Sequence, residues 1–163
     1  MAVQVVFDCM VFLQGAARAE GPAAACLRLA EAGYADLFLS EEILDELRDV
    51  LTRPKIRKKF PALTHEAVEA FLARVDRFAH RVAKPPAVVA LARDPKDEKY
   101  LNLAVAAGAS HLVSWDQDIL DLMDDPSADA RTFRAKFPHI TILDPVAFLN
   151  TLETKAAGKP PAT

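Results

Sequence analysis

The sequence predicts an α/β domain, a three-layer α/β/α sandwich with a mainly parallel central sheet of four to five strands. Short apolar runs alternate along the chain with longer segments of helical periodicity. The first run, Val3 to Phe7, is β-branched and apolar on both faces, which is typical of a central strand in a parallel sheet. Strands that alternate with helices indicate βαβ units, in which helices cover both faces of the sheet.

The next elements are expected to be a helix and a second strand. Proline is favoured in the first turn of a helix, so Gly21-Pro22 marks a helix that continues through the Ala- and Leu-rich stretch from Ala23 to Ala32. Gly33 can end this helix. The apolar run from Leu37 to Leu39 then predicts the second strand.

Two further helices are predicted in the first half of the chain. Ser40 is a suitable N-cap, and the acidic residues after it favour a helix that runs to about Thr52. Apolar residues at helical spacing predict a longer helix from about Thr64 to Val82, which Lys84-Pro85-Pro86 ends.

The second half is expected to add two strands and further helices. Asp94-Pro95 opens a helix that runs to Gly108, Ser110 to Ser114 predicts the third strand, and Asp116 to Met123 predicts one short helix. The segment from Asp124 to Pro138 is polar, and we expect it to be irregular.

The C-terminal part is expected to hold the last strand and helix. Ile140 to Leu143 predicts the fourth strand, and Pro145 to Leu152 predicts the start of the last helix. Lysine, glycine and proline are frequent from Thr154 onward. We therefore expect a single domain over residues 1–153 and a disordered tail over residues 154–163.

Composition narrows the class of protein. A chain of 163 residues with 52% hydrophobic content can bury one substantial core. With 20 basic and 23 acidic residues, the chain has no global positive field, so any nucleic-acid binding must be local or metal-assisted. Two cysteines, Cys9 and Cys26, form neither a disulfide framework nor a CxxC motif, which suits a reducing cytoplasm. We expect no membrane span, because no segment approaches about 20 consecutive apolar residues.

Four acidic residues lie where a strand ends or a helix begins, namely Asp8, Glu46, Asp97 and Asp116. In a parallel sheet, ligands collect beyond the carboxyl ends of the strands, so these acids can converge on one site. Converging carboxylates repel one another, and a bound divalent cation is the usual way to keep them ionised together.

Each of the first two acids also has a purely structural interpretation. Asp8 follows the first strand and could cap nearby backbone, although its position between two apolar runs argues against simple solvation. Glu46 falls just outside the apolar stripe of its helix, whereas Asp45 points away from the stripe. Glu46 could reach the sheet edge or merely extend to solvent.

The other two acids could serve as helix caps. Asp97 faces inward at a helix start, but Asp94 as N-cap with Asp97 three residues later resembles a capping box, and position does not rank Asp97 against Glu98. Asp116 lies just past the third strand and could cap the next helix, a role that Asp118 could share. Ser114 is a natural hydroxyl partner for a phosphate or a metal-bound water.

Four segments in this order carry a family resemblance: VVFDCMVFLQG, LSEEILDELRDVLTRPKIRKKF, RDPKDEKYLNLAVAAGASHLVSWDQDIL and ITILDPVAFL. Together they resemble the PIN domain family of metal-dependent ribonucleases, specifically its branch of VapC-like toxins from toxin–antitoxin systems. The resemblance extends from about Val3 to Phe148 and implies a PIN-like fold.

The resemblance also implies an activity. The acidic site would comprise Asp8, Glu46, Asp97 or Glu98, and Asp116, with Ser114 in the hydroxyl position. The aspartates would hold one or two Mg²⁺ or Mn²⁺ ions, and Glu46 would complete the cluster or help to orient the attacking water. In-line hydrolysis of RNA would leave a 5′-phosphate and a 3′-hydroxyl. The expected partners are RNA, an antitoxin protein and a second copy in a homodimer, with no membrane.

Met10 departs from the family pattern. The first family motif reads Asp-x-Asn, and Met10 cannot supply the amide of that Asn. A PIN fold that has lost efficient catalysis and binds RNA or a protein is therefore the alternative function. A dehalogenase-type phosphatase would need an acid at the same position, and no GxxxxGK[ST] or GxGxxG motif indicates nucleotide binding.

A basic cluster follows the helix that carries Glu46, and its residues are Arg53, Lys55, Arg57, Lys58 and Lys59. These side chains could hold RNA phosphates through sequence-independent contacts, or they could simply form a solvated loop. Trp115 could stack on a base, although a lone Trp beside a strand more often packs. The four histidines are scattered and follow no ligand spacing.

Overall fold

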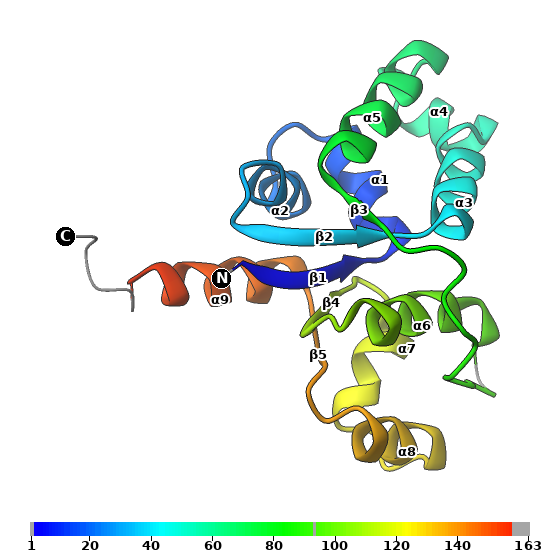
Figure 1. Ribbon diagram of the computed structural model, residues 1–163. Helices are drawn as coiled ribbons and strands as arrows, with labels where there is room; N and C mark the ends of the chain where they lie inside the picture. Colours follow the sequence, from blue (N-terminus) through cyan, green and yellow to red (C-terminus); the bar gives the residue numbers. More distant parts are fainter. Residues whose placement is uncertain (1, 93, 158–163) are drawn as a thin grey trace.

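The computed structural model describes residues 2–92 and 94–157 (Figure 1). Its five strands form one sheet of order β3-β2-β1-β4-β5, in which every pairing is parallel. The strands are β1 Val3–Phe7, β2 Ala35–Leu39, β3 His80–Arg81, β4 His111–Val113 and β5 Thr141–Leu143. The prediction of an α/β domain around a parallel sheet is thereby confirmed.

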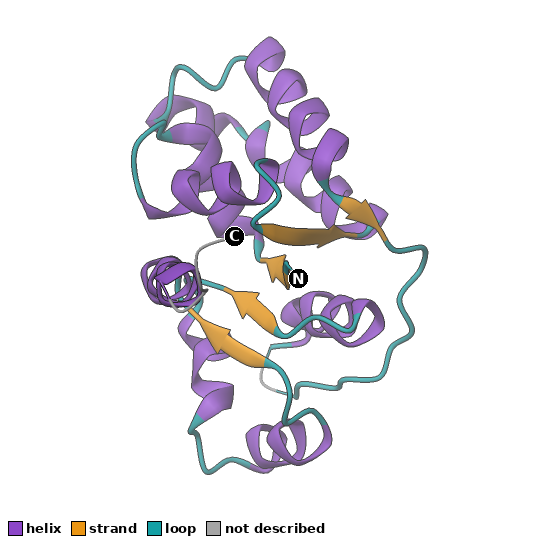
Figure 2. Cartoon of the chain, turned by 60° about the vertical axis from the view of Figure 1, so that its left-hand side comes forward, coloured by secondary structure: helices purple, strands orange, loops and turns teal. Residues whose placement is uncertain are grey.

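Helices lie on both sides of the strands (Figure 2). They are α1 Cys9–Ala17, α2 Pro22–Glu31, α3 Glu41–Leu51, α4 Pro54–Lys59, α5 His65–Phe78, α6 Glu98–Ala107, α7 Gln117–Leu120, α8 Ala128–Lys136 and α9 Pro145–Ala157. Helix α6 packs across β1, β2 and β4, while α2 contacts α1, α9 and β2. Of the helices in the described part of the chain, none is long and apolar enough to cross a membrane.

The strand order creates a switch point between β1 and β4. Strands β2 and β3 extend the sheet on one side of β1, and the chain then returns to place β4 on the other side. The carboxyl ends of β1 and β4 are adjacent, because the Asp8 amide donates to the Val113 carbonyl at 3.0 Å. A crevice beyond these ends is the usual ligand site of a parallel sheet. Asp8 and Ser114 are the first residues beyond the two strands.

Two expectations about the second half of the chain require correction. The segment from Asp124 to Pro138 is not irregular throughout, because it contains α8. Ser127 caps this helix, and Ala130 and Phe133 are the residues of the helix that are buried. The helix expected from Asp94-Pro95 begins as a 3₁₀ turn over Pro95–Asp97, continues as α6 and ends at Gly108, whose φ of 66° is left-handed.

Other differences concern short elements and the C-terminus. Helix α5 ends at Phe78, and His80–Arg81 form the edge strand β3 in place of its expected last turn. The basic cluster forms helix α4 instead of a loop. Helix α9 extends to Ala157, past the expected start of the tail, and the predicted disorder of residues 158–163 falls outside the described residues.

Candidate metal centre

Asp8 is buried at the carboxyl end of β1 and caps α1. Its Oδ1 accepts a hydrogen bond from the Val11 amide at 2.9 Å. Its Oδ2 accepts from the Ser114 hydroxyl and from the Trp115 amide, the latter at 3.3 Å. Burial raises the pKa of the Asp8 carboxyl despite these hydrogen bonds, which act in the opposite direction. Asp8 is therefore both a helix cap and a constrained carboxylate at the switch point.

Ser114 links Asp8 to Asp116. The fully buried Ser114 hydroxyl donates to Asp8 and accepts from the Asp116 amide at 2.9 Å. Asp116 caps α7, since its Oδ1 accepts from the Asp118 amide at 2.8 Å. The cap expected of Asp116 is therefore confirmed, and the same side chain also lies in the acidic cluster.

The centre of the site is a cluster of three carboxylates, Asp94, Asp97 and Asp116. One ligand atom from each of these residues lies within 4.8 Å of those of the other two. The Asp97 side chain is 8% exposed, and its buried Oδ2 has no hydrogen-bond partner among residues 2–92 and 94–157. A buried carboxylate oxygen without a donor is well suited to a cation.

The pKa of Asp97 is raised to about 7. Burial is the largest cause, followed by the nearby charge of Asp116 and by contact with Asp94. In the described backbone neither Asp94 nor Asp97 makes a side-chain capping bond, so the capping-box alternative is wrong.

Glu46 lines the same cleft but is engaged by two other side chains. The Tyr100 hydroxyl donates to Glu46 Oε1 at 2.6 Å, and Lys99 Nζ forms an ion pair with Glu46 Oε2. The Tyr100 oxygen in turn accepts from the Cys9 amide at 3.2 Å. The structure therefore brings Glu46 beside the site, while the three-carboxylate cluster does not include it.

Glu98 accepts a backbone hydrogen bond and does not belong to the carboxylate cluster that includes Asp97. Its Oε1 accepts a hydrogen bond from the Leu91 amide at 2.8 Å and so holds the segment that leads into Asp94. Sequence position could not rank these two acids, and the structure places only Asp97 in the cluster.

The cleft around these residues has a volume of about 680 Å³. Besides Cys9 and Tyr100, it is lined by carboxylates, by cationic side chains and by apolar side chains, the last of which we call the apolar wall. In that order they are Asp8, Glu46, Asp49, Asp94, Asp97 and Asp116; Arg53, Lys96 and Lys99; and Met10, Leu13, Val50 and Ile56.

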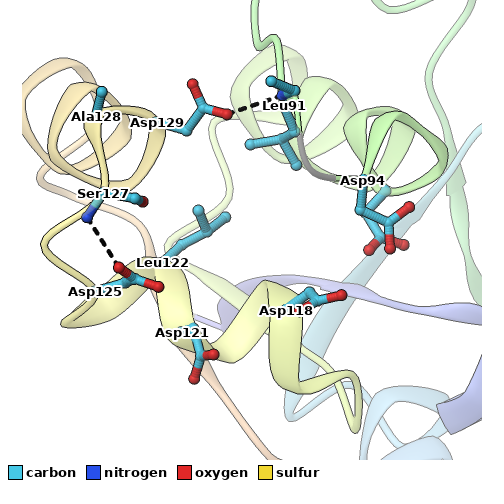
Figure 3. A pocket seen from close by; sticks show the side chains of 11 residues that line it. Leu91, Asp94, Asp118, Asp121, Leu122, Asp125, Ser127, Ala128 and Asp129 are labelled. Atoms are coloured by element: carbon cyan, nitrogen blue, oxygen red, sulfur yellow. Dashed lines mark hydrogen bonds between the residues drawn. The ribbon is translucent and has the colours of Figure 1, made fainter.

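A second, smaller pocket of about 290 Å³ adjoins the cluster (Figure 3). Asp94 and Asp97 line both the cleft and this pocket. On its far side Asp129 Oδ2 accepts from the Ala92 amide at 2.8 Å, which ties the segment before Asp94 to α8. Leu91 and Ala92, shortly before Asp94, are thus held by Glu98 and by Asp129 respectively.

The basic cluster lies on and next to α4, and its members differ in position. Arg53 lines the cleft and pairs with Asp49 at 2.8 Å. The remaining cations are exposed on α4, namely Lys55, Arg57, Lys58 and Lys59. Trp115 is partly buried against the core, in agreement with the packing interpretation.

Sequence reasoning missed three residues of the site. Asp94 was interpreted only as a cap, although the spacing Asp94-x-x-Asp97 around a proline could have suggested two ligands. Lys99 and Tyr100 were overlooked, because their contacts with Glu46 cross from α6 to α3 over more than 50 positions of sequence. No local pattern reports such a contact.

The residues present fit a hard divalent cation. Carboxylate oxygens are the ligands that Mg²⁺ and Mn²⁺ prefer, and Asp97 adds an oxygen without a hydrogen-bond partner among the described residues. Fold and site together define a parallel α/β domain with a cluster of carboxylates at its switch point that could hold a cation.

Comparison with known families agrees with this class. The family model described as "PIN domain" matches residues 4–118, which include all the carboxylates of the cleft, and the chain belongs to this family. PIN domains are generally nucleases and typically depend on divalent metals. No curated protein matches the chain significantly.

Proposed function

We propose that this protein is an endoribonuclease that uses Mg²⁺ or Mn²⁺ and acts in the cytoplasm as the toxin of a toxin–antitoxin pair. The observation that carries the nuclease proposal is the cluster of Asp94, Asp97 and Asp116 beside Asp8. An antitoxin protein and a second copy of the chain are the proposed protein partners. The resemblance of the motifs to VapC-like toxins supports these partners.

The proposed ligands are Asp97, Asp116, Asp94 and Asp8. A divalent ion bound there would lower the pKa of a water molecule and offset negative charge on the phosphate. Ser114 and Trp115 orient the Asp8 carboxylate, and the Ser114 hydroxyl also fixes the backbone before Asp116. Asp97 must lose its proton before it can act as a ligand.

The proposed role of Glu46 is to hold Lys99 at the wall of the cleft. The Lys99 side chain is 15% exposed, and besides Glu46 it contacts the Lys96 carbonyl oxygen at 2.9 Å. A fixed ammonium at this position can meet a phosphate oxygen of the substrate. Glu46 would thus act on the reaction through Lys99 instead of as an ion ligand.

RNA is the proposed substrate, and α4 supports this choice. Its exposed cations lie next to Arg53 and Ile56, which line the cleft. Cations at this edge can hold the phosphates on either side of the cleaved bond without reading sequence.

An RNA cleavage assay with mapped product ends tests the proposal. We expect Mn²⁺-dependent cleavage that leaves a 5′-phosphate and a 3′-hydroxyl, and that EDTA abolishes. Asp116→Asn should remove cleavage while keeping its helix cap, because Asn caps as well as Asp. The matched control is Asp144→Asn, since Asp144 caps α9 through the Ala147 amide at 2.8 Å and does not line the cleft.

Met10 favours one alternative outcome. Its side chain is 43% exposed in the cleft and offers no amide to the carboxylates. If catalysis has been lost, the protein will bind RNA in the presence of Mn²⁺ and release no product. Cleavage that survives Asp116→Asn would instead overturn the proposed site.

A further inference from the structure

The apolar wall of the cleft has no role in the chemistry described so far. Met10 and Leu13 come from α1, Val50 comes from α3 and Ile56 comes from α4. Met10 is one of the few large apolar side chains that are exposed in the described chain. Three helices thus present apolar surface inside a charged cleft, where a ligand that covers it would gain binding free energy.

The charges of the cleft indicate which kind of ligand fits. Carboxylates of Asp94, Asp97 and Asp116 could hold a cation, and Arg53 and Lys96 line the same cleft. A phosphate held by these groups carries a sugar and a base. A nucleic acid combines the apolar faces of its bases with a charged backbone, and this cleft is lined by both apolar and charged side chains.

We infer that the wall of Met10, Val50 and Ile56 is a subsite for one unstacked nucleobase of the RNA, with Met10 in contact with the face of the base. This inference rests on the ribonuclease function proposed above. Methionine suits the role, because its flexible and polarisable thioether packs favourably against flat aromatic rings. Met10 then contributes an apolar contact at the position where the family pattern has Asn.

A structural requirement on the substrate follows. A base inside a duplex is stacked on both faces, and it reaches a protein pocket only after it is unpaired and turned out. The subsite therefore selects single-stranded RNA, or an unpaired nucleotide in a loop, over paired RNA.

Binding measurements test the subsite apart from cleavage. Fluorescence anisotropy compares three labelled probes in Ca²⁺: a short single-stranded RNA, the same RNA annealed to its complement, and single strands with one abasic nucleotide placed at each position in turn. We expect the intact single strand to bind tightest. One abasic position should weaken binding about 2- to 10-fold, the range of a methionine–ring contact.

Variants locate the contact. Met10→Ala should weaken binding of the intact single strand by a similar factor and leave binding of the weakest abasic probe unchanged, while Met10→Leu should restore most of the affinity. Val88→Ala is the control, because Val88 is 45% exposed and does not line the cleft. Met10 is exposed, so these variants should fold, and circular dichroism checks that they do.

Three results would overturn the subsite: duplex bound as tightly as single strand, equal effects of Met10→Ala on intact and abasic probes, or no RNA bound by the unmodified protein. The third result includes the case in which the wall serves a protein partner. Cleavage in Mn²⁺ without these base effects would keep the ribonuclease and reject the subsite. Base-dependent binding without cleavage would keep the base subsite and reject the ribonuclease activity.

Discussion

Ser114 joins two carboxylates of the site through one hydroxyl group. Ser114 is fully buried, and Ser114→Ala removes the acceptor of the Asp116 amide and one of the two donors to Asp8 Oδ2. We expect a loss of about 1–3 kcal/mol in the free energy of unfolding, measured by urea denaturation, together with weaker Mn²⁺ binding.

Ser110→Ala is the control for this substitution. Ser110 precedes β4, and its hydroxyl contacts the Gln4 carbonyl at 3.3 Å and the His111 ring at 2.7 Å. It should lower stability without changing Mn²⁺ affinity, since it lies at the opposite end of the strand. Equal effects of the two substitutions on Mn²⁺ affinity would contradict the assigned role of Ser114.

The raised pKa of Asp97 predicts how the protein responds to pH. The folded protein holds this proton up to about pH 7, whereas an unfolded chain releases it near the ordinary value of 3.8. The free energy of unfolding of the metal-free protein should therefore fall as pH rises from about 4 to about 7, and then level off. Chemical denaturation across this range measures it. Asp97→Asn should remove the part of the slope that Asp97 contributes and leave the part of Asp8, whose pKa burial also raises.

Metal binding should follow the opposite course, because an ion competes with the same proton. We expect Mn²⁺ affinity to rise by about tenfold per pH unit below the pKa of Asp97 and to become flat above it. Isothermal titration calorimetry in buffers of different ionisation enthalpy would count the released protons. Affinity that does not change with pH would show that Asp97 is not a ligand.

Individual site residues could be predicted from the sequence where local pattern marks them, and not where their contacts join distant segments of the chain. Asp8 directly follows β1, Ser114 directly follows β4, and Asp116 lies two residues after Ser114, so all three could be proposed from the predicted strand ends. The ion pair of Glu46 with Lys99 could not be foreseen, since it depends on how α3 and α6 pack. Asp94 was hidden by its resemblance to a cap, because capping and ligand positions have the same residue preference.

The segment over residues 82–92 is held on α6 by side chains. Asn102 Oδ1 accepts from the Val88 and Val89 amides at 2.9 and 2.8 Å, and Glu98 accepts from Leu91. Glu98→Ala should free the residues before Asp94, cost about 1 kcal/mol of stability and weaken Mn²⁺ binding.

Comparison of Glu98→Ala with Glu98→Gln, by titration of Mn²⁺ and by urea denaturation, decides between two roles of this side chain. Gln keeps the acceptor oxygen and should preserve both quantities. If Glu98 were an ion ligand, Gln would weaken Mn²⁺ binding as much as Ala does.

Helix α4 presents exposed cations beside the cleft. Substitution of Lys55 and Lys58 by Ala should weaken RNA binding and reduce the slope of log affinity against log salt concentration by roughly 0.7 for each phosphate contact that is lost. Mn²⁺ affinity should not change. Lys136→Ala on α8, which is also exposed, is the control, and an equal loss there would assign the effect to overall charge.

The long apolar elements were predictable, and the short ones were not. Strand β1 and helices α2 and α3 have clear periodicity or caps and appear close to the expected bounds, while α5 is present but ends before its expected last turn. Strand β3 has two exposed residues, so neither composition nor alternation marks it. In α8 only Ala130 and Phe133 are buried. With so few apolar positions, the segment has the composition of a polar loop and its sequence does not predict a helix.

For the whole molecule, the proposed ion binding should increase stability. An ion that binds only the folded chain should add about 2.7 kcal/mol at a concentration of 100 times Kd. That is several degrees in Tm for a domain of this size. Asp116→Asn should remove the Mn²⁺-dependent shift, whereas Asp144→Asn should retain it. A shift of equal size in both would mean that Mn²⁺ binds elsewhere.

The pairing of charges in the cleft affects the order in which a divalent ion and RNA would bind. Lys99 is paired with Glu46, and Arg53 with Asp49. Among the described residues that line the cleft, Lys96 is then left to balance the remaining aspartates. Without a divalent ion this surface should repel a polyanion. In the proposed ribonuclease we therefore expect the ion to bind before the RNA, or together with it as one of the RNA's own counterions.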